Sequence, residues 1–275
     1  MQNILLMQLA LAAPLSILFG IFGCISSWSK TSFFSHMFSH SLLLPVAIGL
    51  LINITHDWQM MAMCVIFAIL YGFLTSYCSA KSKYHQEDAI LLIVSFFCLA
   101  LALMLTTLSG RSSEVMMYIS GDMIFVDKAD IAIITIMLIC VVAFVKLTWH
   151  QFLLFSINQD ICATKYRHCQ AMNNTYIILQ GVFVAFAVKI SGVMLISATL
   201  IMPALIARRI SNSPFQMIVV SCVTSFCTMF FGIIVAFQGN LHTQSVIVII
   251  YCLIMSALFA GTLARSFFQS NVVKN

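Results

Sequence analysis

The sequence predicts an all-helical integral membrane protein, and its composition is the basis of that prediction. Of its 275 residues, 62% are hydrophobic and only 8% are charged. A soluble globular domain usually carries about 25% charged residues, so this chain lacks the polar surface that such a domain needs. Its hydrophobicity also excludes intrinsic disorder. Because a spanning helix needs about 20 mostly apolar residues, the chain has room for nine spans joined by short loops.

Nine apolar stretches along the chain are the predicted spans. They cover residues 4–27, 32–54, 59–79, 88–108, 130–150, 173–189, 191–207, 216–237 and 244–264. The first has no basic region before it and continues past about 20 apolar residues, so it is predicted to be retained rather than cleaved as a signal peptide. No internal repeat, Pro-rich linker or low-complexity tract interrupts the series. The sequence therefore predicts a single domain over residues 1–275.

The stretch from residue 173 to residue 207 requires a choice between one helix and two. A single helix of this length would extend about 52 Å at 1.5 Å per residue. The hydrocarbon core of a bilayer is only about 30 Å thick. We therefore predict two spans joined by a tight turn at residues 189–192.

The basic residues predict the orientation of these spans. With the N-terminus outside, ten of the 13 Lys and Arg residues lie at the inner ends of spans or in inner loops. The remaining three are Arg111, Lys128 and Lys189. Cytoplasmic loops carry an excess of Lys and Arg, so the C-terminus is predicted to be cytoplasmic. This excess of basic residues on the inner side is obtained only if the chain crosses the membrane nine times.

His36 and His40 form the clearest candidate site, because ionisable side chains are expensive inside a membrane span. Residues four apart on a helix lie on one face, one turn from each other. Two neutral imidazoles at that spacing are able to bind one divalent transition metal, and imidazole suits zinc, copper, iron and nickel. Ser35 and Ser39 lie beside them as hydrogen-bond partners. The alternative is that both histidines only pack between helices and bond to backbone carbonyls.

The net charge and the cysteines predict little further chemistry. A net charge of +5 is typical of loop anchors in membrane proteins, and we do not interpret it as nucleic-acid binding. None of the ten cysteines forms a C-x-x-C pair, so they are predicted to be small buried apolar residues rather than disulfides or zinc ligands. Cys162, His168 and Cys169 occur in one loop, but their spacing matches no common metal site.

Catalytic motifs are missing from the sequence. It contains no G-x-x-x-x-G-K-[ST], so the chain is not expected to hydrolyse ATP through a P-loop of its own. It also contains no G-x-S-x-G, no H-E-x-x-H and no paired carboxylates within a span. We therefore predict a protein without catalytic residues and without a resident cofactor.

The seventh predicted span combines small residues, which allow close helix packing, with a basic inner end. Pro203 removes a backbone hydrogen bond near that end and permits a kink. Arg208 and Arg209 follow, and a polar stretch then runs from Ser211 to Pro214, where the proline suits the first turn of a short helix. A kinked span leading into a short basic helix is a suitable docking surface for a partner. A plain loop with two basic anchors is the alternative.

This segment resembles the signature of the permease subunits of metal-type ABC importers, which take up zinc, manganese or iron. The matching residues are Gly192, Leu195, Ala198, Leu200, Pro203, Ala204, Ala207 and Arg208. Residues 32–49 are similar to the family's second-span motif, 119–126 to its Gly-Asp loop and 156–163 to its cytoplasmic loop. The four motifs occur in the family's order, and the resemblance covers most of the chain.

The second-span motif departs from the family pattern at two positions. His36 stands where the family usually has Asp, while the family's His is kept as His40. Pro45 stands where the family has Gly. Two imidazoles make a softer and less negative site than one imidazole and one carboxylate. The first change therefore favours zinc or ferrous iron over manganese.

The resemblance implies a homodimer with a central pathway in a bacterial inner membrane. It also implies a cytoplasmic ABC ATPase dimer that binds ATP, and a periplasmic metal-binding protein that delivers the metal. The residues expected to couple the chain to the ATPase are Pro203, Arg208, Arg209, Ser211 and Pro214. Two alternatives stay open. One is an ABC permease for manganese, iron or an organic metal chelate, and with an organic substrate the two histidines would only pack. The other is a stand-alone secondary transporter driven by protons or sodium.

Overall fold

The computed structural model is helical throughout the part of the chain that it describes, which confirms the all-helical prediction. That part comprises residues 2–29, 31–54, 56–81, 87–111, 113, 115, 116, 119, 121 and 127–272. Its helices are α1 (Gln2–Trp28), α2 (Ser32–Ser41), α3 (Leu43–Leu51), α4 (Asp57–Lys81), α5 (Glu87–Ser109), α7 (Lys128–Ile157), α8 (Gln159–Lys165), α9 (Cys169–Ile210), α10 (Pro214–Gly239) and α11 (Thr243–Val272). Within these residues, eight helical segments are long and apolar enough to cross a membrane.

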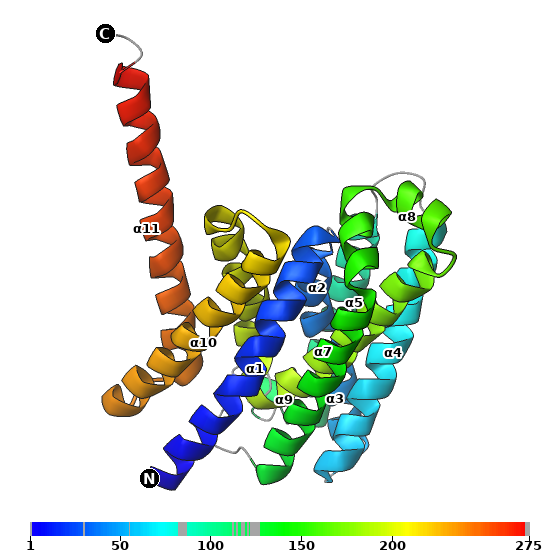
Figure 1. Ribbon diagram of the computed structural model, residues 1–275. Coiled ribbons are helices and arrows are strands. Elements are labelled where there is room, and N and C mark those ends of the chain that lie inside the picture. Colours follow the sequence, from blue (N-terminus) through cyan, green and yellow to red (C-terminus); the bar gives the residue numbers. More distant parts are fainter. Residues whose placement is uncertain are drawn as a thin grey trace.

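The 42-residue helix α9 consists of two spans separated at Gly192. This glycine has φ 67° and ψ 163°, a conformation that residues with a Cβ rarely adopt. Figure 1 shows α9 leaving the end of the bundle that carries α8, reaching the opposite end and returning. The interruption falls inside the predicted turn at residues 189–192. Counting both halves brings the described spans to nine. Pro203 lies within the second half, whose backbone remains helical there.

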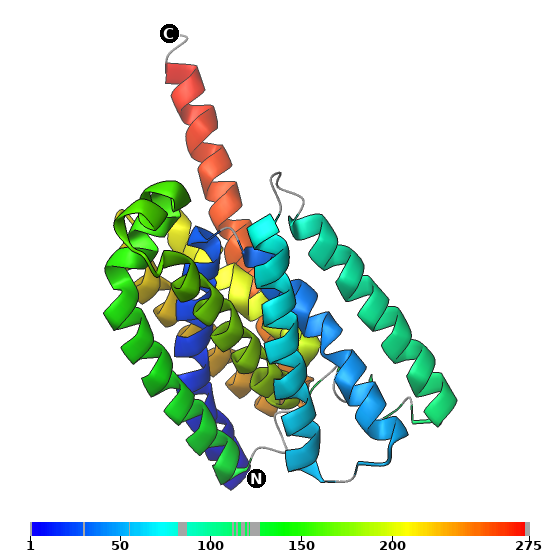
Figure 2. The ribbon, with the colours of Figure 1, turned by 90° about the vertical axis from the view of Figure 1, so that its right-hand side faces the viewer.

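The two ends of the chain lie at opposite ends of the bundle, as an odd number of crossings requires. Figures 1 and 2 both show the N-terminus at one end and the C-terminus at the other, with the C-terminal part of α11 extending beyond the neighbouring helices. Figure 1 also shows α8 at the end of the bundle from which α11 extends. The predicted inner loop that carries α8 therefore lies at the same end as the C-terminus.

The predicted span 32–54 is not one continuous helix, because the chain breaks at Leu42 between α2 and α3. Pro45 explains the break. It has no N–H to donate to the Ser41 carbonyl, and its ring crowds that carbonyl. One turn earlier, the hydroxyls of Ser41 and Ser95 donate to the Met37 carbonyl oxygen at 3.0 and 2.6 Å. The break makes α2 a short separate helix.

Helix α1 lies in the core, where it packs against α10, α9 and α7. Two glycines allow the closest approaches. A Cβ on Gly20 would lie 2.7 Å from the Cys222 backbone, and a Cβ on Gly23 would overlap the Leu200 carbonyl. Tyr176 donates its O–H to the Phe22 carbonyl at 3.0 Å. Gly20 lets α1 approach the backbone of α10, and Gly23 lets it approach the backbone of α9, as small residues do in membrane bundles.

The opposite end of the bundle, where the predicted outer loops lie, is held by an ion pair and a close loop contact. Lys189 Nζ lies 3.4 Å from Asp130 Oδ1, which joins the start of α7 to the middle of α9. Gly121 has φ 56°, and a Cβ on it would overlap the backbone of Ser191 and Gly192. Residues 122–126 of the predicted Gly-Asp loop lie outside the described residues.

Candidate functional site

The two predicted metal ligands face each other on α2. The imidazole rings of His36 and His40 have centroids 4.8 Å apart and meet edge to face, with an angle of 89° between their planes. Both side chains are half-buried. The two residues therefore lie on one face of one helix, as their spacing predicts. Within the described residues, no group of three His, Cys, Asp or Glu side chains is arranged to hold a metal ion.

Helix α2 is anchored by hydroxyl and amide groups from two neighbouring helices. Ser95 of α5 donates to the Met37 carbonyl, and the hydroxyls of Ser39 and Ser197 lie 3.4 Å apart, linking α2 to the second half of α9. Ser39 also donates to the His36 carbonyl at 2.8 Å. These contacts hold the backbone that carries the imidazoles, which limits how far the two rings are able to move independently of α5 and α9.

Gln180 is a site residue that the sequence reasoning missed. It is completely buried in the first half of α9, and its side-chain amide donates to Ser35 of α2 and to Ser26 of α1. Its amide oxygen has no hydrogen-bond partner in the described part of the chain. An amide inside the apolar stretch 173–189 was the available signal, because a buried polar side chain needs a partner in a membrane.

The segment after α9 is exposed and basic, but it is not the short helix that the sequence predicted. α9 ends at Ile210, and α10 begins directly at Pro214, so the expected separate helix is wrong. Pro214 does occupy the first turn of a helix. Ser213 caps that helix by accepting the Gln216 N–H at 3.2 Å, and the Gln216 side chain accepts the Asn212 N–H at 3.1 Å. This capping gives the exposed segment a defined shape.

The two arginines of this segment have different surroundings. Both side chains are exposed. The Arg209 guanidinium lies 5.1 Å from the ring centroid of Phe259 on α11, within the range of a cation–π contact. Phe215, which follows Pro214, is 69% exposed. The segment therefore offers positive charge and an aromatic side chain at the same end of the bundle as α8.

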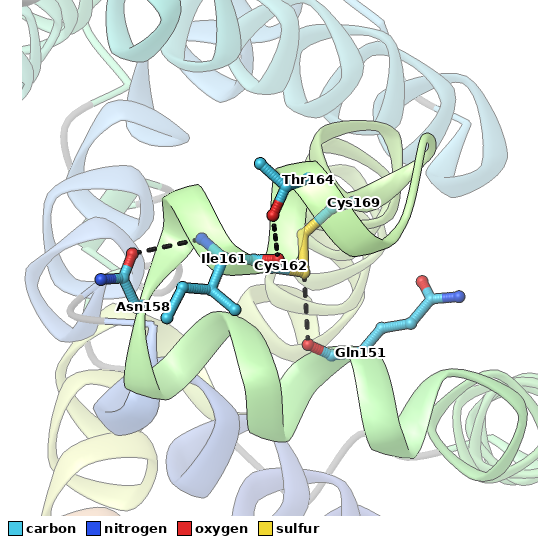
Figure 3. Close-up of a disulfide and its surroundings, with 6 residues drawn as sticks. All are labelled: Gln151, Asn158, Ile161, Cys162, Thr164 and Cys169. Carbon is cyan, nitrogen blue, oxygen red and sulfur yellow. Dashed lines mark hydrogen bonds between the residues drawn. A yellow bond between two sulfur atoms is a disulfide. The ribbon is translucent and has the colours of Figure 1, made fainter.

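The prediction that the cysteines form no disulfides was wrong for one pair. Cys162 of α8 and Cys169 at the start of α9 are joined, with Cα atoms 6.0 Å apart (Figure 3). The intervening residues make a compact turn, in which the Tyr166 N–H donates to the Cys162 carbonyl at 2.8 Å. This turn brings together two cysteines that lack a recognisable spacing motif. While Cys162 and Cys169 are joined, neither offers the thiolate that a metal site with His168 would need.

An apolar bundle that crosses a membrane several times, carries an imidazole pair on one internal helix and exposes a basic segment at one end is typical of a polytopic membrane permease. The chain belongs to the ABC 3 transport family, whose profile matches residues 1–261. It is therefore a transport subunit, in agreement with the resemblance of its four motifs.

Named relatives match most of the chain. The high-affinity zinc uptake system membrane protein ZnuB of Haemophilus influenzae is 26% identical over 261 residues, covering 94% of this chain and 98% of the relative. ZnuB of Buchnera aphidicola subsp. Acyrthosiphon pisum is 26% identical over 221 residues, covering 80% and 82%. The structure of PsaBC from Streptococcus pneumoniae in complex with Fab has the same fold, with a TM-score of 0.77 at 21% identity, covering 92% of this chain and 89% of that chain.

Proposed function

We propose that this chain is the membrane-spanning subunit of an ABC importer that carries zinc into the cytoplasm of a bacterial cell. The His36–His40 pair is the observation that carries the choice of zinc. Two imidazoles bound to one tetrahedral zinc, with Zn–N bonds of about 2.1 Å, have ring centroids about 5 Å apart. The observed centroid separation of 4.8 Å is close to that value. The zinc systems named for the two ZnuB relatives support the same choice.

The pair supplies two ligands, whereas zinc in proteins usually has four. Because no third ligand joins the pair within the described residues, the proposal places the remaining ligands on a second copy of the chain. A homodimer of this single-domain permease would bring two such pairs to a central pathway and offer four imidazoles. Zinc is cargo here, so binding needs to be weak enough to release it.

The exposed segment 208–216 is the proposed contact for a cytoplasmic ABC ATPase dimer, which would bind and hydrolyse ATP. Arg208, Arg209 and Phe215 provide the charge and the aromatic side chain that partner surfaces favour. With this segment inside, the N-terminus faces the periplasm, where a metal-binding protein would deliver zinc. The basic loops then lie on the cytoplasmic side of the inner membrane.

The function is tested by metal uptake in a bacterial strain that lacks this chain. The strain is expected to take up little radioactive zinc from medium depleted of metal, and a copy of the gene should restore uptake. A tagged copy should co-purify with an ATPase subunit. Restoration of manganese uptake without zinc uptake would contradict the metal assignment. Uptake that persists without ATP would indicate a secondary transporter.

The disulfide provides a test of the proposed orientation. Cytoplasmic thiols are kept reduced by glutathione and thioredoxin. If the end that carries α8 faces the cytoplasm, Cys162 and Cys169 are expected to be two thiols in growing cells and to join only after treatment with a thiol oxidant such as diamide. Acid quenching followed by a maleimide–polyethylene glycol gel shift would count the thiols.

The matched control for this count is the double variant Cys162→Ser/Cys169→Ser. The parent chain from untreated cells should carry two more maleimide additions than the variant, and oxidation should remove the difference. A bond already present in untreated cells would place this end in an oxidising compartment and contradict the orientation. Reporter fusions at both termini provide an independent measurement.

A further inference from the structure

A small group of buried side chains lies directly under the exposed segment 208–216. It consists of Cys24 of α1, Ala204 and Ala207 of α9, and Met217 of α10, and it is separate from the main hydrophobic core. We refer to these four residues as the end cluster. Trp28 packs against them from the end of α1. The end cluster is therefore the place where α1 meets both helices that flank the segment.

Met217 makes one hydrogen bond to the exposed segment and two to α1. Its backbone N–H donates to the carbonyl of Ser213, the capping residue of α10. Its carbonyl oxygen accepts from Cys24 Sγ at 3.5 Å, and its Sδ accepts the indole N–H of Trp28 at 3.2 Å. Met217 is 6% exposed. A displacement of the first turn of α10 must therefore move α1 or break these contacts.

The contacts continue from α1 toward the imidazole pair. Ser26 Oγ donates to the Thr31 carbonyl at 3.0 Å, and the Thr31 N–H donates to the Ser26 carbonyl at 3.0 Å. These bonds tie the end of α1 to the residue immediately before α2. His36 lies in the second turn of α2. The path from the exposed segment to the imidazoles consequently runs through one short, hydrogen-bonded connection.

We propose that Met217 and Trp28 are positioning residues that transmit movement of the exposed segment 208–216 to the helix that carries His36 and His40. This proposal rests on the proposed function, because the ATPase would supply the movement. Neither residue contacts the metal. Their role is to make α1, the start of α10 and the start of α2 move together when the segment is displaced.

The experiment reconstitutes the permease with its ATPase in proteoliposomes and measures zinc transported per ATP hydrolysed. Met217→Ala is expected to lower this ratio by about tenfold, within the range reported for substitutions that weaken coupling between sites. Trp28→Phe keeps an aromatic ring against Trp149, whose ring centroid lies 6.0 Å away, but loses the indole N–H. It should lower the ratio less. Met217→Leu, which conserves apolar volume, should recover most of the parental ratio.

Met229→Ala is the matched control, because Met229 is a fully buried methionine on the same helix that belongs to the main core. It should lower the melting temperature at least as much as Met217→Ala and leave the ratio unchanged. Two results would overturn the proposal. One is an equal loss of zinc transported per ATP in Met217→Ala and Met229→Ala, and the other is a parental ratio in both Met217→Ala and Trp28→Phe. If Met217→Ala fails to assemble, the ratio measured for Trp28→Phe decides whether the proposal holds. A parent chain that binds no ATPase would instead refute the proposed function, and with it this inference.

Discussion

Replacing either His36 or His40 by alanine is expected to reduce zinc uptake by at least about tenfold, a loss typical of even indirect damage to a metal site. The physical reason is the number of ligands. In the proposed dimer each substitution removes two of four imidazoles, and the described residues of the chain offer no third ligand beside the pair. The measurement is uptake of radioactive zinc by cells that depend on this transporter, with expression matched between variants.

The control for the histidine variants is His150→Ala, because His150 is exposed on α7 and does not belong to the pair. It should leave uptake unchanged. His36→Asp, which restores the family's usual residue, should keep transport and shift preference toward manganese, since carboxylate oxygen suits harder ions. Parental uptake by both alanine variants, in chains that still assemble, would mean that the histidines only pack against each other.

Reversing the charges of Arg208 and Arg209 to glutamate is expected to abolish stable ATPase binding, or to leave hydrolysis that no longer drives transport. Placing like charges opposite each other at an interface costs several kcal/mol. Both arginine side chains are exposed, so these substitutions create no buried charge. Co-purification of the ATPase and the ratio of transport to hydrolysis are the two measurements. Normal transport by the double variant would contradict the proposed contact.

The single variants separate the contributions of the two arginines. Arg209→Glu also removes the cation–π contact with Phe259, so part of its effect would come from α11. Phe259→Leu removes the ring and keeps the arginine, which measures that part alone. Arg208→Glu is therefore the cleaner test of ATPase contact. Lys165→Glu, an exposed charge reversal on α8 at the same end, is the matched control and should leave ATPase binding intact. Reporter fusions at the C-terminus would check that each variant inserts normally.

The candidate site could be predicted only in part from the sequence. The spacing of His36 and His40 is a local property of a helix, so four residues of separation were enough to place both rings on one face. Whether the pair binds metal is still a prediction. The role of Gln180 was missed because a single amide in an apolar stretch does not reveal its partners. Those partners, Ser26 and Ser35, lie about 150 residues away in the chain.

Two local features differ from the prediction. The span predicted over residues 32–54 is broken at Leu42, because Pro45 cannot continue the helical hydrogen bonds. The cysteines are predicted to be unpaired because none of them forms a C-x-x-C pair. The turn between them brings Cys162 and Cys169 within bonding distance. A motif search tests spacing alone, whereas a disulfide depends on the path of the backbone between the two residues.

The number of spans, the turn at Gly192 and the all-helical architecture were determined by the sequence alone. The hydrophobic length of a segment decides whether it crosses a bilayer, and backbone groups in lipid must be satisfied within a helix. Contacts between distant segments were decided only by the tertiary structure. The Trp28–Met217 contact, the Asp130–Lys189 ion pair and the anchoring of α2 by Ser95 and Ser197 all join separate helices. Apolar spans with similar lengths are compatible with many packings, and only side-chain fit and hydrogen bonding between particular residues select one of them.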